Sequence, residues 1–363
     1  MSSIIRSPFM KKALQQPYWL PILSHSYPSK SFCKITASTA VPHMTAPRYY
    51  SSPPPLETDA AHASVQRRSK VTIKSLNRMY KHGEPISMMT AQDYPSGLMV
   101  DRSGIDICLV GDSLAMVALG YDSTNPLTVE EMLHHCRAVA RGSKAPFLVA
   151  DLPYGSYEVS PEEAVRASLR FLKEGNMEAV KLEGGKEMAE TIRRITTVGV
   201  PVMAHIGLTP QRQSALGGFR VQGKTAKQAM GLVEDALAVQ EAGAFAVVLE
   251  AMPAQIAHYI TQQLSVPTIG IGAGVQCSGQ VLVMNDALGL FDRFVPKFTK
   301  QYCNLNQIMT QALQQYHLDV KTKQFPAPVN TYPIDQAQLD KFWRSVNYNQ
   351  DQEKESSVVS HHG

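Results

Sequence analysis

The sequence is poor in cysteine and in charge, and it contains no long apolar run. Its five cysteines are widely spaced and form no Cys-x-x-Cys pair, which argues against structural zinc and for a reducing compartment. No stretch of about 18 uncharged apolar residues occurs, so neither a transmembrane helix nor a membrane partner is expected. With 44% hydrophobic and 18% charged residues, the chain predicts one large globular domain with tails.

Acidic residues are absent from the first 56 positions, which contain six Lys or Arg residues and many serines. This composition is typical of a mitochondrial transit peptide, and we predict one over residues 1–50, with the mature chain in the matrix. The run Arg48–Ser51 resembles a matrix-protease site, and the alternative is an ordinary disordered N-terminus. Without the leader the formal charge falls from +4 to −2, because 29 basic residues then face 31 acidic ones. The charge therefore gives no argument for a nucleic-acid partner.

The composition changes at two further boundaries. Residues 51–69 are rich in Pro, Ala and Ser and then basic, which is typical of a linker. Over residues 70–326, short apolar runs alternate with longer amphipathic stretches, as in βα units around a parallel sheet. Residues 327–363 form a polar, Pro-interrupted C-terminal extension, and we expect its last part, 350–363, to be disordered.

Seven near-continuous apolar runs predict strands that are covered on both faces. An eighth strand is placed in either Gly279–Met284 or Phe294–Phe298, because closing a barrel requires one of them. We therefore predict a (β/α)8 TIM barrel, with a helix at Ile73–His82 covering its bottom. The seven runs are Ile86–Ala91, Ile105–Gly111, Pro146–Asp151, Ala179–Glu183, Val200–Ile206, Ala244–Glu250 and Thr268–Gly272. The helices predicted between them are Thr128–Ala140, Ser160–Glu174, Lys186–Thr196, Thr225–Ala242 and Pro253–Leu264.

Polar residues stand at the ends of these runs, where the active site of a (β/α)8 barrel lies. Asp112, Asp151 and Glu183 are carboxylates from consecutive strands, and like charges repel unless a cation lies among them. Because no Cys lies beside them and the nearby His is single, oxygen ligands favour magnesium over zinc. The alternative is that each carboxylate is a helix N-cap or a surface ion-pair partner.

Three more strand-end residues suit catalysis. Lys181 lies two residues before Glu183, so both side chains point to the same face of the strand, where a Lys suits a substrate carboxylate or a developing negative charge. Glu250 follows an apolar run, as a general base in apolar surroundings would. His205 is suited to positioning a hydroxyl or water, although a lone His in a strand is more often a core residue. For Lys181 the alternative is a buried ion pair without chemistry.

Several motifs now identify a resemblance. From Val71 to Pro326 the chain resembles the ketopantoate hydroxymethyltransferase family, in both the order and the spacing of its motifs. The matching segments are Thr90–Tyr94, Leu109–Leu114, His134–His135, Ala150–Pro153, Val180–Gly185, His205–Gln211, Gln222–Gly223, Leu249–Glu250 and Ile269–Gly274. Two positions depart from the family pattern: Gln92 stands where Tyr is common, and Asn285 where His is frequent.

The resemblance implies a fold of the phosphoenolpyruvate/pyruvate barrel type and a reaction. The family transfers a hydroxymethyl group from 5,10-methylenetetrahydrofolate to 3-methyl-2-oxobutanoate, through Mg²⁺-assisted enolate formation, and thereby makes 2-dehydropantoate for pantothenate biosynthesis. It also implies small-molecule substrates and a homo-oligomer, commonly a decamer. The roles implied are Asp112, Asp151 and Glu183 for the metal, with the first two direct ligands that also contact substrate; Ser113 and Lys181 for the oxo-acid carboxylate; Glu250 as the base; and His205 beside the new hydroxymethyl group.

Two other functions fit part of the pattern. A carbon–carbon lyase or phosphonomutase of the same barrel type also holds magnesium and a 2-oxo acid, but such lyases typically carry a Lys-Lys-Cys-Gly-His motif, which this sequence lacks. A catalytically dead barrel that only binds folate or an oxo acid is expected to have lost a site group. Asp112, Asp151, Lys181, Glu183 and Glu250 are all present.

Overall fold

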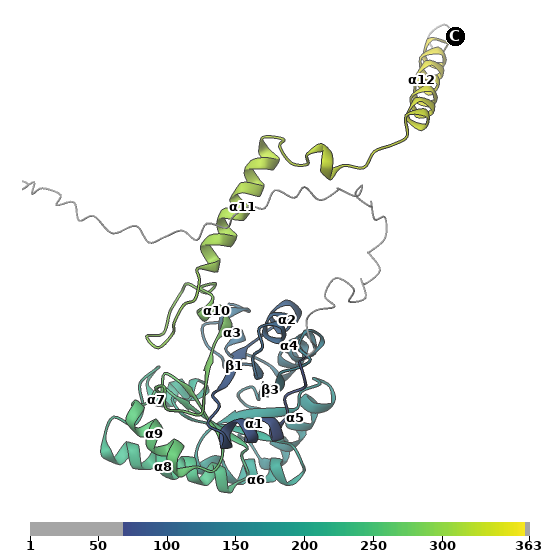
Figure 1. Cartoon of the computed structure of the whole chain (residues 1–363). Coiled ribbons are helices and arrows are strands. Elements are labelled where there is room, and N and C mark those ends of the chain that lie inside the picture. The colour runs from purple at the N-terminus through teal and green to yellow at the C-terminus, as the bar shows by residue number, and fades with distance from the viewer. Residues whose placement is uncertain (1–67, 360–363) are drawn as a thin grey trace, which may run out of the picture. The chain divides into compact units, whose positions relative to one another are not determined.

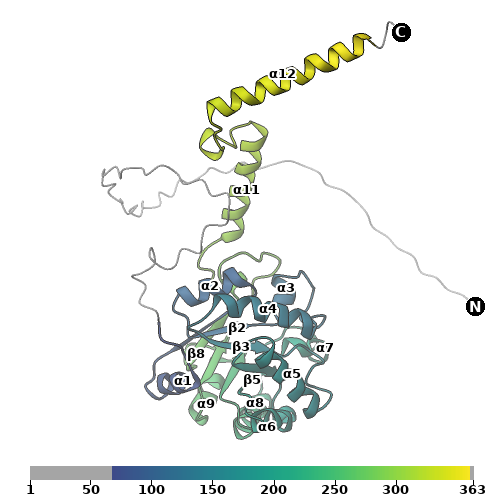
Figure 2. The same ribbon diagram turned by 90° about the vertical axis from the view of Figure 1, so that its right-hand side faces the viewer.

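The computed structural model describes residues 68–359, without the side chains of Leu216 and of residues 348–359. Its core is a closed barrel of eight parallel strands in chain order, surrounded by helices (Figures 1 and 2). The predicted (β/α)8 barrel is therefore confirmed, whereas the predicted transit peptide and most of the linker lie outside the described residues. The strands are β1 Ile86–Thr90, β2 Ile107–Val110, β3 Phe147–Asp151, β4 Ala179–Glu183, β5 Val202–Gly207, β6 Ala246–Glu250, β7 Thr268–Ile271 and β8 Gly279–Leu282.

The structure decides between the two predicted positions of the eighth strand. β8 pairs in parallel with β1 on one side and with β7 on the other, so Gly279–Met284 was the correct alternative. The other candidate, Phe294–Phe298, is not a strand; instead Phe298 packs against Gly272 and lines the barrel mouth. Unlike β2 to β7, β8 alternates between buried and more exposed residues, and Gln280 on its outer side is exposed. Its weak apolar pattern follows from this one-sided burial.

The helices lie where amphipathic stretches predicted them, with additions at the strand ends and in the C-terminal region. The long ones around the barrel are α1 Ile73–Lys81, α2 Tyr94–Arg102, α4 Val129–Gly142, α5 Pro161–Lys173, α6 Ala189–Thr197, α8 Ala226–Glu241 and α9 Ala254–Gln263. Short ones are α3 Leu114–Val117, α7 Gln213–Leu216, α10 Met284–Ala287, and the 3-10 turns η1 Lys186–Met188, η2 Pro210–Arg212 and η3 Pro328–Asn330. The sequence did not predict α2, whose Gly97 weakens a helical pattern although Asp93 caps its N-terminus and Pro95 fits its first turn.

Apolar residues pack in two separate layers. Ile107 and Leu109 of β2 point into the barrel, whereas Cys108 and Val110 pack under the surrounding helices. This double burial explains why the strands read as continuous apolar runs. Leu76 and Met79 of α1 belong to the interior cluster, so the prediction that this helix covers the barrel bottom is confirmed.

The C-terminal region is more helical than expected. α11 spans Leu305–Lys321 and none of its residues is buried, and α12 spans Gln336–Val359. We expected disorder over 350–363, but the structure is helical through Val359, and residues 360–363 lie outside the described part. The reason is compositional, since residues 336–359 contain neither Gly nor Pro and many good helix formers. None of the helices in the described part has the length and apolar character needed to span a bilayer.

Candidate active site

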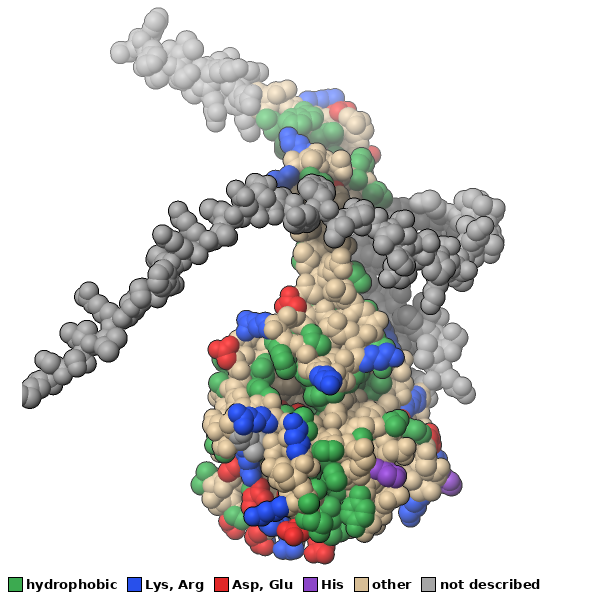
Figure 3. All heavy atoms as spheres, turned by 90° about the vertical axis from the view of Figure 1, so that its left-hand side faces the viewer, with side chains coloured by type: hydrophobic (Ala, Val, Ile, Leu, Met, Phe, Trp, Pro, Cys, Tyr) green, Lys and Arg blue, Asp and Glu red, His purple; other side chains and the backbone are tan. Residues whose placement is uncertain are grey.

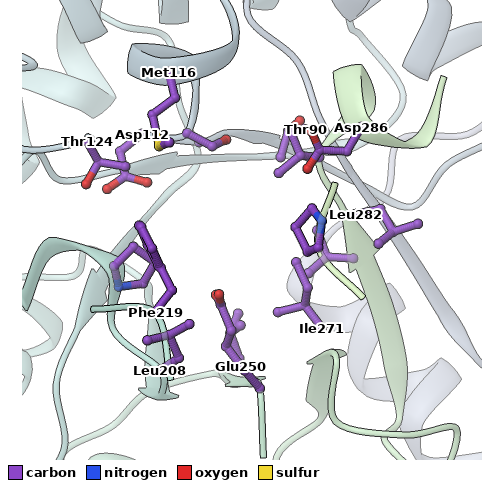
Figure 4. Close-up of a pocket in the computed structure, with 18 of the residues that line it drawn as sticks. Thr90, Asp112, Met116, Thr124, Leu208, Phe219, Glu250, Ile271, Leu282 and Asp286 are labelled. Carbon is purple, nitrogen blue, oxygen red and sulfur yellow. The ribbon is translucent and has the colours of Figure 1, made fainter. Parts of the chain in front are cut away.

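One cavity of about 350 Å³ opens at the carboxyl ends of the strands (Figure 4). Every site residue predicted from strand ends contributes to its wall, together with Ser113 from the turn after β2. The predicted convergence on one barrel mouth is therefore confirmed. The predicted residues in the wall are Asp112, Ser113, Asp151, Lys181, Glu183, His205 and Glu250.

The strand register brings the acidic residues together. Asp151 lies beside Lys181 on the neighbouring strand, and Glu183 beside His205. Lys181 Nζ donates to Asp151 Oδ1 at 2.7 Å, while the backbone N–H of Asp112 donates to Asp151 Oδ2 at 2.9 Å. The Asp112, Asp151 and Glu183 side chains are all buried. Burial excludes surface partners, and the N-caps of the helices that follow these strands are Ser113, Ser160 and Gly185, so neither alternative applies to the three acids.

Burial and mutual repulsion disfavour the charged form of the acids in this cluster. Burial raises the pKa of Asp112 to about 8, with a further rise from the charges of Asp151 and Glu183. Burial alone would lower the pKa of Lys181, but Asp151, Asp112 and Glu183 outweigh burial and raise it. Lys181 pairs with Asp151 and His205 lies beside Glu183, whereas Asp112 has no ion-pair partner among the described residues. This part of the cavity wall therefore favours a bound cation.

The donor set suits a hard divalent cation such as magnesium, which takes oxygen ligands and is often held by only one or two carboxylates. Across the described residues, no three His, Cys, Asp or Glu side chains converge closely enough to form a metal centre. One Asp151 oxygen bonds Lys181, and one oxygen each of Asp112 and Glu183 accepts a bond from Gln211. The chemistry of the residues fits a cation held by two carboxylates rather than a closed three-acid cage.

Gln211 and Tyr157 brace the cluster, and neither was predicted as a site residue. Gln211 Nε2 donates to Asp112 Oδ2 at 2.8 Å, and its backbone N–H donates to Glu183 Oε2 at 3.1 Å. The fully buried Tyr157 donates its hydroxyl hydrogen to Gln211 Oε1 and accepts from the Glu183 N–H. Tyr157 lies in the loop after β3, so a sequence reading limited to strand ends does not find it.

His205 lies between two acids. Its Nε2 is 3.2 Å from Glu250 Oε2 and its Nδ1 is 3.5 Å from Glu183 Oε1, although neither nitrogen has hydrogen-bond geometry in the described residues. Burial and the charge of Lys181 would lower its pKa, but Glu183 and Glu250 raise it to about 9. His205 is therefore not an ordinary apolar core residue. It links the acidic cluster to Glu250.

An unusual backbone presents Glu250 to the cavity. Ala251 directly after it has φ +47°, a left-handed conformation that costs a residue with a side chain about 1 kcal/mol or more. Gly207 on β5 is the register partner of Glu250 and has φ +98°. A Cβ at Gly207 would come within 2.3 Å of the Glu250 carbonyl oxygen. Glycine is required because the two strand ends approach so closely.

The far wall of the cavity contains residues that the sequence reading missed. Figure 4 shows Thr90 and Asp286 across the cavity from Asp112, with Glu250 between the two sides. Asp286 follows β8, so the strand-end rule would have found it had β8 been placed. The two departures from the family pattern lie next to this wall, beside Asp286, and contact each other, because Gln92 Nε2 donates to Asn285 Oδ1 at 3.1 Å.

Comparison with known proteins agrees with this geometry. The family model described as ketopantoate hydroxymethyltransferase matches residues 70–328. The chain belongs to this family. The 3-methyl-2-oxobutanoate hydroxymethyltransferase of Emericella nidulans is 54% identical over 312 residues, covering 85% of this chain and 88% of that protein. A relative from rice (Oryza sativa subsp. japonica) is named 3-methyl-2-oxobutanoate hydroxymethyltransferase 2, mitochondrial. It is 52% identical over 283 residues, covering 76% of this chain and 71% of that protein.

The ketopantoate hydroxymethyltransferase family assignment makes the chain an enzyme of the transferase class. Solved structures show similar folds at low identity. A phosphonopyruvate hydrolase in complex with oxalate and Mg²⁺ has a TM-score of 0.49 and 13% identity, covering 77% of this chain and 98% of that one. A 2,3-dimethylmalate lyase has a TM-score of 0.44 and 14% identity, covering 79% and 98%. Neither likeness bears on function.

Replacing Tyr157 with Phe tests the brace. The change leaves Gln211 Oε1 and the Glu183 N–H without their partner, so we expect the free energy of unfolding to fall by about 1–3 kcal/mol. Tyr80→Phe is the matched control, since it loses one hydrogen bond, to the Leu264 carbonyl, at the other end of the barrel. Both variants are measured by urea unfolding and by the KM for the oxo acid. We expect the KM to rise in Tyr157→Phe alone. A KM that rises equally in both variants, or in neither, contradicts the role of Tyr157 in holding the acidic cluster.

Proposed function

We propose that this chain transfers a hydroxymethyl group from 5,10-methylenetetrahydrofolate to 3-methyl-2-oxobutanoate and so forms 2-dehydropantoate. The observation that carries the proposal is that Glu250, Lys181 and a buried acidic cluster line one cavity in a member of this family. The three groups supply a base, an anion partner and a cation site. These are the needs of a reaction that removes a proton next to a carbonyl group.

The oxo acid would bind at the side of the cavity formed by β2 and β4. Ser113 and Lys181 take its carboxylate, because Lys181 is the ammonium of the acidic cluster and Ser113 begins the helix α3 beside it. The Lys181 ammonium then bonds both the substrate and Asp151, so the substrate anion adds to an existing ion pair. Asp112 and Asp151 contact the substrate from the same side.

Magnesium would be held directly by Asp112 and Asp151, with Glu183 completing the acidic set. When bound, the cation supplies a Lewis acid that polarises the 2-oxo group and makes the C3–H bond more acidic. Gln211 holds Asp112 and Glu183 in place by the two hydrogen bonds described above. The lack of an ion-pair partner for Asp112 among the described residues supports this assignment.

Glu250 takes the proton from C3 of the oxo acid. The resulting enolate carbon forms a bond to the one-carbon unit of the folate, and water supplies the hydroxyl that completes 2-dehydropantoate as tetrahydrofolate leaves. His205, 3.2 Å from Glu250, orients the base and lies where the new hydroxymethyl group forms. The apolar walls of the cavity reduce competing protonation of the enolate by water.

Deuterium exchange at C3 of 3-methyl-2-oxobutanoate and product formation together test the reaction. For the full chain with magnesium, we expect exchange without folate and product when 5,10-methylenetetrahydrofolate is added, and both should stop when EDTA removes the metal. Glu250→Gln should slow both by about 10²–10⁴-fold, because the base is lost.

Asp112→Asn should raise the concentration of magnesium that the enzyme requires. Binding of Mn²⁺ in place of magnesium is measured by its signal in electron paramagnetic resonance. Glu241→Gln, an exposed acid at the end of α8, is the control.

A chain that folds and binds the oxo acid without exchanging the C3 proton would instead be a binding protein. Exchange without product would leave a lyase-type barrel, since proton removal is common to both reactions.

We further propose that residues 1–50 direct the chain to the mitochondrial matrix. The support is the acid-free, basic composition of this segment and the mitochondrial label of the rice relative. We expect residues 1–50 fused to a fluorescent protein to reach mitochondria and to be shortened to a chain that begins near Ser51. Replacing the six Lys and Arg residues with Gln should abolish import. Import of the neutral version, measured by fractionation and N-terminal sequencing, contradicts the proposal.

We also propose a homo-oligomer, the family-type decamer, as the working form. The exposed apolar side chains of α11 support it, since Ile308, Leu313 and Tyr316 are 56%, 65% and 56% exposed. In sedimentation velocity the full chain should run far above its 39.9 kDa mass. Leu313→Ser together with Ile308→Ser should lower the oligomer mass, whereas Gln314→Ser should not. A wild-type monomer at micromolar concentration contradicts the proposal.

A further inference from the structure

Asp286 is a buried carboxylate that the proposed reaction leaves without a role. It is 7% exposed and lies on the cavity wall, in α10 directly after β8. Its Oδ1 has no hydrogen-bond partner among the described residues. Burial alone raises its pKa, to about 6, and no charged neighbour contributes. An uncompensated buried carboxylate destabilises the folded chain, so its presence at a cavity calls for a ligand.

The turn that holds Asp286 is itself well fixed. Asn285 Nδ2 donates to the Val117 carbonyl at 2.9 Å, and its Oδ1 accepts from Gln92. The Met284 N–H donates to Thr90 Oγ1 at 2.9 Å. These bonds connect α10 to the end of β1 and to the segments that follow β1 and β2. Asp286 is therefore held at its place on the wall before any ligand arrives, which favours binding.

The position of Asp286 excludes two kinds of ligand. It lies across the cavity from Asp112, away from the side where Lys181 would take the oxo-acid carboxylate, and a second carboxylate would repel that anion (Figure 4). A cation site of its own needs several oxygen ligands, and among the described residues no second carboxylate lies close enough to Asp286 to affect its pKa. What a carboxylate in this position can bind is a group of the ligand that donates hydrogen bonds.

We infer that Asp286 binds the pterin ring of the folate donor through the amino group at C2 and the N–H at N3. These two donors point the same way, and a carboxylate accepts such a pair with both oxygens. The inference rests on the proposed function, because it assigns a place to the donor of that reaction.

The surroundings of Asp286 fit a flat ring with an anionic tail. Val283 directly precedes α10, and Phe291 lies close to it because its N–H bonds the Asn285 carbonyl. Both residues line the cavity, as does Phe298, and such apolar side chains suit the faces of a pterin. Arg220 and Lys297 also line the cavity and are exposed, as partners for the carboxylates of the glutamate tail would be. Figure 3 shows Lys and Arg side chains beside hydrophobic ones around a hollow on one face of the molecule.

Asp286→Asn tests the assignment in the full chain with magnesium. The amide keeps the shape of the side chain but places an NH₂ group against the pterin donors. We therefore expect tetrahydrofolate to bind at least about tenfold more weakly in calorimetry, and the KM for 5,10-methylenetetrahydrofolate to rise by a similar factor. C3 deuterium exchange of the oxo acid should stay within about twofold, because that step does not involve the donor. Asp292→Asn, an exposed acid in the following loop, is the matched control and should bind as wild type.

A pair of ligands separates recognition of the pterin edge from a general effect on the pocket. Wild type should prefer 6-methyltetrahydropterin to 6-methyltetrahydrolumazine, which has an oxygen at C2 in place of the amino group, and Asp286→Asn should lose this preference. Unchanged tetrahydrofolate binding by Asp286→Asn, or no preference in wild type, overturns the role of Asp286 alone. A wild-type chain that exchanges the C3 proton but binds no tetrahydrofolate overturns the proposed donor, and the pterin assignment with it.

Discussion

The parallel pairing of β8 with β1 closes the barrel, and the arrangement of the mouth depends on that closure. Hydrogen bonds around the ring fix the register of each strand against the next, so that Asp151 meets Lys181 and Glu183 meets His205. The same closure places Asp286 after β8 near Thr90 at the end of β1, across the cavity from Asp112 (Figure 4). A slip of one residue in any pair would turn a site residue to the opposite face of the sheet.

The residues of the barrel mouth destabilise the folded chain, and packing elsewhere in the barrel compensates for them. Buried carboxylates, a buried ammonium and a left-handed Ala251 all destabilise the chain, while two layers of apolar packing on either side of the sheet offset them. The supporting residues are neutral hydrogen-bonding groups such as Gln211 and Tyr157, which hold the acids without adding charge. Local violations of ordinary folding preferences gathered at one place are typical of a functional site.

Much of the site could be read from the chain because barrel geometry converts order along the sequence into position in space. Asp112, Asp151, Lys181, Glu183, His205 and Glu250 each end an apolar run, and all of them reach the cavity. Tyr157 and Gln211 could not be assigned in this way, since their partners lie 26 to 99 residues away along the chain. Asp286 was missed for a different reason: β8 is half exposed, so its apolar pattern is too weak to mark where it ends.

The sequence by itself determined the alternation of strands and helices, the acid-free leader and the residues that end each strand, because these depend on local composition and on periodicity. Tertiary structure decided which of two segments closed the barrel, which of the acids pairs with the ammonium, and that His205 stands between Glu183 and Glu250. It also decided that Asp286 Oδ1 is buried without a hydrogen-bond partner in the described part of the chain. Burial and pairing across long stretches of chain are properties of the packed molecule, and no local pattern contains them.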